Sequence, residues 1–414
     1  MVYVLNQNRQ PLMPTEDHRM VRLLLKSKKA KVVKRTPFTI QLLVDTKNYV
    51  QIVKLGVDAG SKTIGLSAST ENKELFAAEL KPRNDVVNSL STRRECRRTR
   101  RNRKTRYRAK RFNNRVHSKH KGWLAPSVEV KVQEHITAIK RICKILPIAE
   151  VIVETAEFDL QLIKAVEAGL PVPQGEDYQK GEQLGFYNVR QYVLWRDGYT
   201  CQCCGAHGDG VKLQTHHLES RKTGGNSPDV LITLCSHCHE QVTNGKILSF
   251  NKRKRKSTRD AAFMGIMRKT LISRLRDELK IPVKETKGYI TKYLREKHNL
   301  EKSHTMDALC IAGHPTAKRI ERIYLIRPVR NHNRQLHKAT ILKGGIRKTN
   351  QAATYIKGFR LYDKVLYNNQ ECFIWGRRTS GSMLLRLLDG TKIKDGAGYR
   401  NLKLLERSSN YLIS

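Results

Sequence analysis

Hydrophobic and polar residues alternate in short runs over the first 80 positions, which predicts several short β-strands and one helix. The helix is expected near His18–Ser27 and is basic. Tight turns separate the later runs, and the first of them, residues 51–57, is rich in β-branched residues. We interpret the last three runs as a hairpin meander whose first strand ends at Asp58. The expected strands are residues 2–5, 38–44, 51–57, 63–68 and 74–80.

Helical periodicity dominates the middle of the chain. Residues 126–146 carry apolar side chains at helical spacing, and a buried strand follows from Ala149 to Val153, ending at Glu154. From about residue 318, short strands separated by turn residues predict a small β-barrel-like domain. No internal repeat is visible. Further helices are expected at roughly 258–279, 286–297 and 305–312.

Charge changes this picture, because the 414 residues include 80 Lys and Arg but 37 Asp and Glu, for a net charge of +43. Such an excess repels itself and favours a polyanionic partner. Nucleic acid is the obvious one, since each cation that meets a phosphate releases a counterion. A merely soluble basic protein is the alternative, and the size of the excess argues against it.

Residues 93–121 concentrate this charge, with 15 Lys or Arg among 29 residues and Glu95 as the only acid. An isolated helix of this composition is destabilised by repulsion, but phosphates along it would stabilise it, as in Arg-rich segments that order on RNA. A solvated basic tail is the alternative. The residues expected on one helical face are Arg93, Arg97, Arg100, Lys104, Arg108, Arg111 and Arg115.

Length and cysteine usage set the class of protein. The length is typical of two to four domains, and no apolar run approaches the ~20 residues that span a bilayer. The start, Met1–Leu5, is too short for a signal peptide. Nine cysteines, four of them in two close pairs, fit a reduced compartment and a metal site better than a disulfide framework. We therefore expect a cytoplasmic protein with no membrane contact.

Two C-x-x-C pairs, Cys201 with Cys204 and Cys235 with Cys238, have the spacing of zinc knuckles. Four thiolates on two tight turns form the tetrahedron of a structural zinc site. A segment with so little core needs such a ligand to fold. Unligated thiols are the alternative.

Three histidines near the knuckles, His216, His217 and His239, are either further zinc ligands, surface groups or catalytic residues. The segment resembles the ββα-metal module of the HNH nucleases. This resemblance implies that His216 and His239 hold one Mg²⁺ and that His217 is the general base. A neutral imidazole suits that role near pH 7. The matching stretches are 199–205, His216-His217, Gly224-Gly225 and 234–239.

One position departs from the HNH pattern. Val230 stands where the family usually has an asparagine, and Asn226 lies four residues earlier. The departure bears on the orientation of the His217 loop rather than on the ligand set.

Three scattered carboxylates, Asp58, Glu154 and Asp307, form a second candidate site. Taken singly, Asp58 fits an ordinary turn, Glu154 fits a solvated strand end, and Asp307 lies on an apolar helix face. Together, two of them end strands expected to be neighbours in a mixed sheet, and the third lies on a helix expected to pack against it. Convergent carboxylates are the ligands that two Mg²⁺ ions require. His304, one turn before Asp307, would either ligate or shuttle a proton.

The carboxylate segments resemble the RuvC-type, RNase H-like nuclease core. The Arg-rich helix and the HNH-like segment interrupt it, an order shared by type II CRISPR effectors and their small transposon-associated relatives. With Pro11-Leu12-Met13-Pro14 near its start, the chain resembles the IscB family. The resemblance implies a mixed α/β fold. It divides the chain into a PLMP domain (1–50), RuvC parts (51–92, 122–180 and 256–317), a bridge helix (93–121), an HNH domain (181–255) and a β-rich domain (318–414).

The resemblance also implies a function: RNA-guided cleavage of duplex DNA by a monomeric ribonucleoprotein. A structured guide, the ωRNA, would pair with the target strand. HNH would cut that strand and RuvC the displaced one, with two Mg²⁺ in RuvC, one in HNH, and a structural Zn. The β-rich domain would read a motif beside the target. Side chains that would reach its bases include Arg330, Asn333, Arg334, Arg377 and Arg378.

Two other functions remain open from the sequence. One is a guide-independent endonuclease, which would cut at a fixed sequence without RNA. The other is a non-catalytic RNA- or DNA-binding zinc protein. The second would be favoured if Asp58, Glu154 and Asp307 lay more than ~10 Å apart, because the ions of two-metal sites are ~4 Å from each other.

Overall fold

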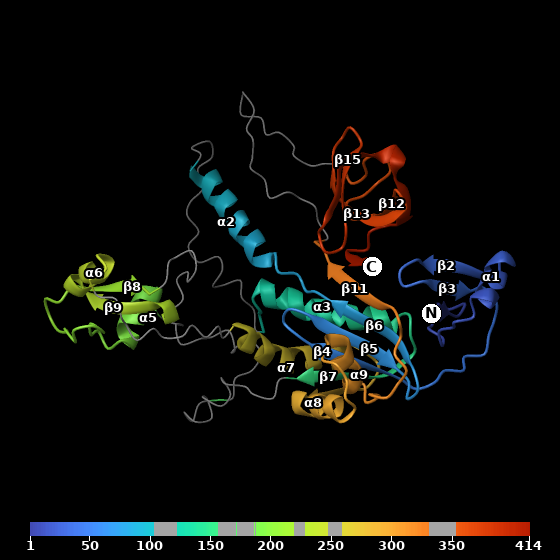
Figure 1. Cartoon of the computed structure of the whole chain (residues 1–414), viewed down its shortest axis with the longest axis horizontal. Helices are drawn as coiled ribbons and strands as arrows, with labels where there is room; N and C mark the ends of the chain where they lie inside the picture. The colour runs from blue at the N-terminus through green and yellow to red at the C-terminus, as the bar shows by residue number, and fades with distance from the viewer. Residues whose placement is uncertain are drawn as a thin grey trace. The chain divides into compact units, whose positions relative to one another are not determined.

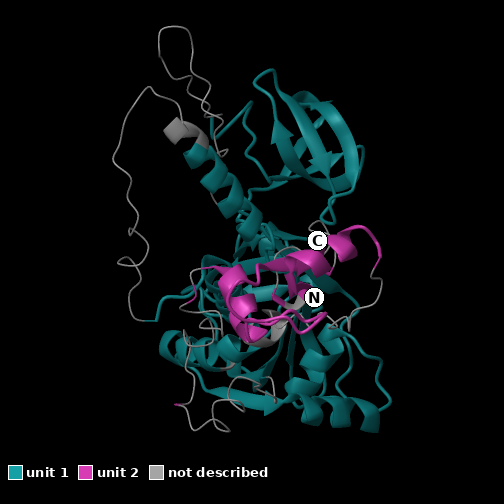
Figure 2. Ribbon diagram, turned by 90° about the vertical axis from the view of Figure 1, so that its left-hand side faces the viewer, with its two compact units in different colours: residues 1–159, 263–414 teal, residues 160–262 magenta. Residues whose placement is uncertain are grey.

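The structure is a computed structural model, in which the chain forms two compact units (Figures 1 and 2). Unit 1 is Met1–Asp159 with Phe263–Ser414, and unit 2 is Leu160–Ala262. In the part described, no helix combines the length and apolar character needed to cross a bilayer. The structure describes residues 1–102, 122–155, 171, 186, 188–218, 228–246, 259–330 and 353–414.

A mixed sheet, seven-stranded within the described residues, is the centre of unit 1, in the order β10-β7-β4-β5-β6-β11-β17 (Figure 1). The predicted meander is confirmed: β4, β5 and β6 are antiparallel neighbours. Strand β7 pairs in parallel with β4, and β10 in parallel with β7. The strands are β4 (Val53–Ala59), β5 (Ile64–Ser69), β6 (Glu74–Leu80), β7 (Ile148–Thr155), β10 (Val283–Lys287), β11 (Ile323–Pro328) and β17 (Tyr411–Ile413).

Strand β4 has two different faces, because successive strand residues point to opposite sides of a sheet. The odd-numbered residues of Val53–Ala59 lie in the main core. Helices α3 (Pro126–Cys143) and α7 (Arg259–Glu278) supply apolar side chains to that core. The even-numbered Gly56 approaches helix α9 (His304–Ile311) instead. Asp58, two residues on, therefore faces the side of the sheet that carries α9.

The N-terminal segment forms a separate small sheet in the order β1-β3-β2. The predicted strands and helix are found, and the structure adds β2, which the charged sequence Ala-Lys-Val-Val-Lys did not indicate. The Tyr3 hydroxyl donates a 3.0 Å hydrogen bond to the Leu75 carbonyl of β6. The elements are β1 (Tyr3–Leu5), α1 (His18–Lys26), β2 (Ala30–Lys34) and β3 (Thr39–Leu42).

The C-terminal segment forms an antiparallel sheet in the order β15-β14-β13-β12-β16, with its own apolar core. The structure differs from the expected 318–414 domain at both ends. Strand β11 pairs with β6 and β17 pairs with β11, so both belong to the central sheet. Alternation within a short strand gives its buried face but not its partner. The strands are β12 (Lys364–Tyr367), β13 (Gln370–Arg377), β14 (Ser382–Arg386), β15 (Lys392–Gly398) and β16 (Lys403–Glu406).

The basic helix α2 spans Val86–Asn102 and so begins seven residues before the expected start. Arg93 and Arg97 are exposed on it. Arg100 lies in the helix, but its side chain is outside the described part. The expected continuation to residue 121, with Lys104, Arg108, Arg111 and Arg115, also lies outside the described residues.

Unit 2 contains a two-stranded sheet, β8 (Leu213–His217) with β9 (Leu231–Cys235), and helices α5 (Val189–Arg196) and α6 (Ser236–Thr243). The two strands are antiparallel, and α6 directly follows β9. The buried Asp197 carboxylate accepts a 3.0 Å hydrogen bond from the Thr233 amide and pairs with Arg196. This contact holds the end of α5 against β9.

Candidate active sites and a candidate zinc site

Neighbouring parallel strands bring the first two predicted acids together. In the register of β4 and β7, Val57 pairs with Val153. Asp58 and Glu154 each follow that pair by one residue, so both lie at the same, carboxyl-terminal end of their parallel strands. The prediction that these two acids end adjacent strands is confirmed.

Two glycines let helix α9 come close enough to add a third acid. A Cβ on Gly56 would lie 1.9 Å from the Ala308 carbonyl oxygen, and one on Gly65 would lie 2.0 Å from the His304 carbonyl oxygen. Only residues without a Cβ fit at these points. The close approach positions His304 and Asp307 beside the ends of β4 and β7.

Each of the three carboxylates contacts a different side chain. His304 Nδ1 lies 2.6 Å from Asp58 Oδ2. On helix α8 (Gly288–Lys297), the Thr291 hydroxyl donates a 2.5 Å hydrogen bond to Glu154 Oε2, and Arg295 Nε lies 3.1 Å from Asp307 Oδ1.

Thr291 and Arg295 were not among the residues predicted for this site. Residues four apart share one face of a helix, so the pair follows from the helical pattern once α8 is known to lie beside the carboxylates. Residue types alone carried no such signal.

Burial and mutual repulsion set the electrostatics of this cluster. Burial raises the pKa of Asp58, the contact with His304 lowers it, and the charge of Asp307 raises it again. Burial also raises the pKa of Glu154, the Thr291 hydrogen bond lowers it, and the charges of Asp58 and Asp307 raise it. The three acids therefore share one region of unfavourable negative charge.

This arrangement fits a divalent cation, because carboxylate oxygens are hard ligands and a bound cation relieves their repulsion. The ligand atoms of these three acids are less closely grouped than those of the four cysteines in unit 2. Within the described residues, only Cys201, Cys204, Cys235 and Cys238 form a metal-binding group, with sulfur atoms within 4.8 Å of one another. Each acid is turned instead to its own partner on α8 or α9.

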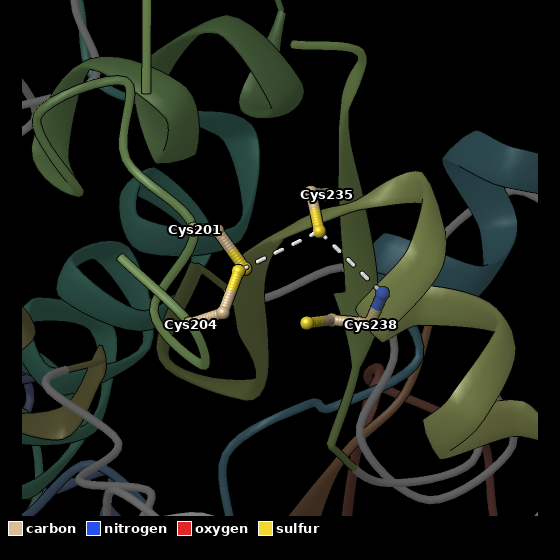
Figure 3. A group of neighbouring side chains, drawn as sticks. All are labelled: Cys201, Cys204, Cys235 and Cys238. Carbon is tan, nitrogen blue, oxygen red and sulfur yellow. Dashed lines mark hydrogen bonds between the residues drawn. The ribbon is translucent and has the colours of Figure 1, made fainter. Parts of the chain in front are cut away.

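The four predicted zinc ligands come together in unit 2 (Figure 3). Cys204 Sγ lies 3.7 Å from Cys235 Sγ, and the amide of Cys238 donates to Cys235 Sγ over 3.5 Å. Cys201, Cys235 and Cys238 are buried with Leu234 in a small apolar cluster. The group is compatible with a zinc site, as the spacing predicts.

Crowding of the thiols supports that interpretation. Burial raises the pKa of Cys201, but hydrogen bonds from the amides of Cys204, Cys235 and Cys203 outweigh it and bring the pKa to about 7. For Cys238, burial and the neighbouring thiols both raise the pKa. The Cys201 thiol is thus prepared to lose its proton, while that of Cys238 needs a nearby cation to do so.

The structure brings two of the three candidate histidines together. The rings of His216, on β8, and His239, on α6, have centroids 5.0 Å apart and are nearly perpendicular. Burial lowers the pKa of His216, and the charges of His239 and His217 lower it further. The imidazole of His216 thus favours the neutral form that ligates metals.

Next to these residues, His217 ends strand β8 opposite Leu231. The Leu218 amide donates a 2.8 Å hydrogen bond to the Val230 carbonyl, which closes the hairpin just after His217. Val230, 2% exposed, turns its side chain into the interior. Asn226 lies outside the described residues. The main-chain pairing of Leu218 with Val230 thus fixes the hairpin at the position where an asparagine was expected.

The predicted base-reading residues have varied surroundings. Arg377 donates to the carbonyls of Thr354 and Phe359, so it holds its own domain together. Arg378 forms an exposed ion pair with Asp395. Arg330 lines a cavity, and Asn333 and Arg334 lie outside the described residues.

Two family models match the chain. Residues 2–181 match the one described as RRXRR protein, and residues 201–245 match the one described as HNH endonuclease. The sequence Arg97-Arg98-Thr99-Arg100-Arg101, on α2, contains the pattern of the first name. No curated protein matches the chain. The chain thus contains an RRXRR region and an HNH endonuclease domain.

Solved structures of Cas9 also match. Streptococcus thermophilus Cas9 in complex with AGGA PAM is 13% identical over 46% of this chain, with a TM-score of 0.29. The same protein with AGAA PAM is 12% identical over 63% of this chain, with a TM-score of 0.32. The Type II-C Cas9 from Actinomyces naeslundii is 16% identical over 45%, with a TM-score of 0.15. The chain spans 26%, 32% and 27% of the chains in these three structures, respectively.

Proposed function

We propose that the chain is an RNA-guided DNA endonuclease of the IscB type, with a separate metal-dependent site for each strand of a duplex. One observation carries the proposal: Asp58, Glu154 and Asp307 come from segments far apart in the sequence and meet in one negatively charged region. The HNH domain supplies the other site. Two sites of different chemistry in one chain suit the two strands of a duplex.

In the HNH domain, His216 and His239 would hold a divalent cation, and His217 would take the proton of the attacking water. The two ligand rings already lie side by side. The four cysteines would hold zinc and thereby fix β9 and α6, which carry Cys235 and His239. This site would cut the guide-paired strand.

In unit 1, Asp58, Glu154 and Asp307 would hold two Mg²⁺ ions. Bound there, the ions would stabilise the charge on the scissile phosphate and on the leaving oxygen. His304, whose Nδ1 contacts Asp58, would accept the proton of the attacking water at Nε2. Thr291 and Arg295 would hold Glu154 and Asp307 in position. This site would cut the displaced strand.

The guide itself is inferred from charge. A net charge of +43 and the Arg-rich helix exceed what contact with one short DNA duplex requires. A long ωRNA would neutralise this surface, and base pairing would supply the sequence specificity that phosphate contacts lack. Helix α2, with Arg93 and Arg97 exposed, is the expected guide contact.

Cleavage of a matching duplex tests the proposal. The protein is purified with its RNA, the RNA is sequenced, and a duplex matching its variable segment is incubated with Mg²⁺. We expect a double-strand break that disappears after RNase treatment or chelation. It should also disappear in the double variant Asp58→Ala/His217→Ala, while the exposed Asp277→Ala serves as control. Cutting that persists without RNA would favour a guide-independent endonuclease.

A non-catalytic function for unit 2 has one observation in its favour, the buried Val230 in place of the expected asparagine. If unit 2 is non-catalytic, the protein nicks only the displaced strand. Restoring the amide with Val230→Asn should then produce the second nick, whereas in the proposed nuclease the wild type already makes both.

A further inference from the structure

We propose that a cavity in unit 1 binds an unpaired base of the RNA, an inference that rests on the RNA partner proposed above. The cavity measures about 450 Å³, within the roughly 300–1,000 Å³ usual for ligand sites. It lies where the chain leaves β6 for helix α2, between β11 and the C-terminal sheet. Its charged and aromatic lining includes Arg83, Asp85, Arg327, Arg330, Tyr362 and Trp375.

The cavity has an aromatic and cationic wall. The rings of Trp375 and Tyr362 are 5.5 Å apart and nearly perpendicular. The Arg327 guanidinium lies 5.2 Å from the centre of the Trp375 ring and donates a 3.0 Å hydrogen bond to the Leu388 carbonyl. Unpaired bases stack on such rings and on guanidinium planes.

Two features of this wall indicate that it is built for a ligand. The indole Nε1 of Trp375 is buried and has no acceptor among the described residues, which is unfavourable unless another molecule supplies one. A base offers carbonyl oxygens and ring nitrogens as acceptors. Tyr362 adopts φ of +66°, which is uncommon for a bulky residue and is frequent at binding sites.

Charge favours a nucleic acid strand as the occupant. Arg330 and Arg327 stand at the cavity, and the basic helix α2 starts at Val86, directly after the lining residue Asp85. Three acids line the cavity, of which Asp85 accepts two hydrogen bonds from Arg83, Asp389 accepts two from Thr391, and Glu79 lies on β6. A strand whose phosphates follow α2 would thus pass the cavity.

The occupant is an unpaired base because a base inside a duplex is stacked on its neighbours and cannot enter the cavity. Sequence-specific RNA recognition mostly uses bases splayed out of loops and single strands. An intact DNA duplex has none to offer without distortion, so RNA is favoured over the unopened target. The displaced DNA strand is the competing occupant, and the single-stranded DNA probe below represents it.

Photocrosslinking of the full-length, RNA-free protein tests this inference without any cleavage. The probes are a short unstructured RNA, the single-stranded DNA of the same sequence, and the corresponding DNA duplex. We expect RNA crosslinks on the peptides that carry Tyr362 and Trp375. Trp375→Ala should remove them and weaken RNA binding on the order of tenfold, typical of one lost stack.

Trp195→Ala is the matched control, since Trp195 is 53% exposed and lies on α5 of unit 2. Thermal unfolding shows whether Trp375→Ala is folded. If it is not, Trp375→Phe should retain the crosslink at Tyr362, and Arg327→Gln should weaken RNA binding. Equal binding by wild type and these folded variants, or preferential crosslinking of either DNA probe, would overturn the inference. Loss of nuclease activity alone would leave it standing.

Discussion

The substitution Gly56→Ala probes how the carboxylate site is assembled. The added Cβ would lie 1.9 Å from the Ala308 carbonyl oxygen and 2.7 Å from the Ala312 amide nitrogen. Ordinary contacts begin at 3.4 Å, so the backbone of α9 must withdraw by about 1.5 Å, the difference between 3.4 and 1.9. Overpacking of this kind typically lowers the free energy of unfolding by about 1–3 kcal/mol. The shift carries Asp307 and His304 away from Asp58.

A displacement of that size should slow nicking of the displaced strand on the order of a hundredfold. The assay uses a duplex labelled differently on each strand, with stability followed by denaturant unfolding. Gly398→Ala is the control, because a Cβ there meets nothing within 4 Å. Nicking of the guide-paired strand should stay at the wild-type rate. Wild-type nicking of both strands together with wild-type stability in Gly56→Ala would refute the packing argument.

Three further predictions concern single contacts. Thr291→Val removes the hydrogen bond that lowers the pKa of Glu154, so the acid limb of displaced-strand nicking should move to higher pH, while Thr291→Ser keeps the wild-type profile. Cys238→Ser should abolish bound zinc, measured by atomic absorption, and nicking of the guide-paired strand; retained zinc would contradict the four-cysteine site. Burial lowers the pKa of His135 to about 4, so folding holds it neutral and stability falls as pH drops from about 6.5 to 4. His135→Gln should remove up to about 3 kcal/mol of that dependence in unfolding curves, and an unchanged pH dependence would contradict it.

Much of the fold was predictable because its signals are local. Alternation gave the meander of β4, β5 and β6, and helical spacing gave α3 and α9. The C-x-x-C pairs predicted the cysteine cluster, since the spacing brings the two sulfur atoms of each pair together and two such pairs complete a tetrahedral site. The adjacency of Asp58 and Glu154 followed from expecting their strands to be neighbours.

What the sequence did not reveal depends on contacts between distant segments. Strands β11 and β17 join the central sheet through pairing with β6 and with each other, which short strands do not encode locally. Arg295 reaches Asp307 only because α8 packs beside the carboxylates. Its local sequence is no different from that of an arginine exposed on a helix surface. The cavity beside Trp375 likewise forms from strands that are far apart in the chain.

The central claim, two independent cutting sites, is tested most directly by strand-resolved cleavage with single variants. The ribonucleoproteins of Asp58→Ala and His217→Ala are each given a duplex that matches the guide, and the nicked strand is identified. If the two sites cut independently, Asp58→Ala nicks only the guide-paired strand and His217→Ala only the displaced strand. Breaks in both strands by either variant would contradict it.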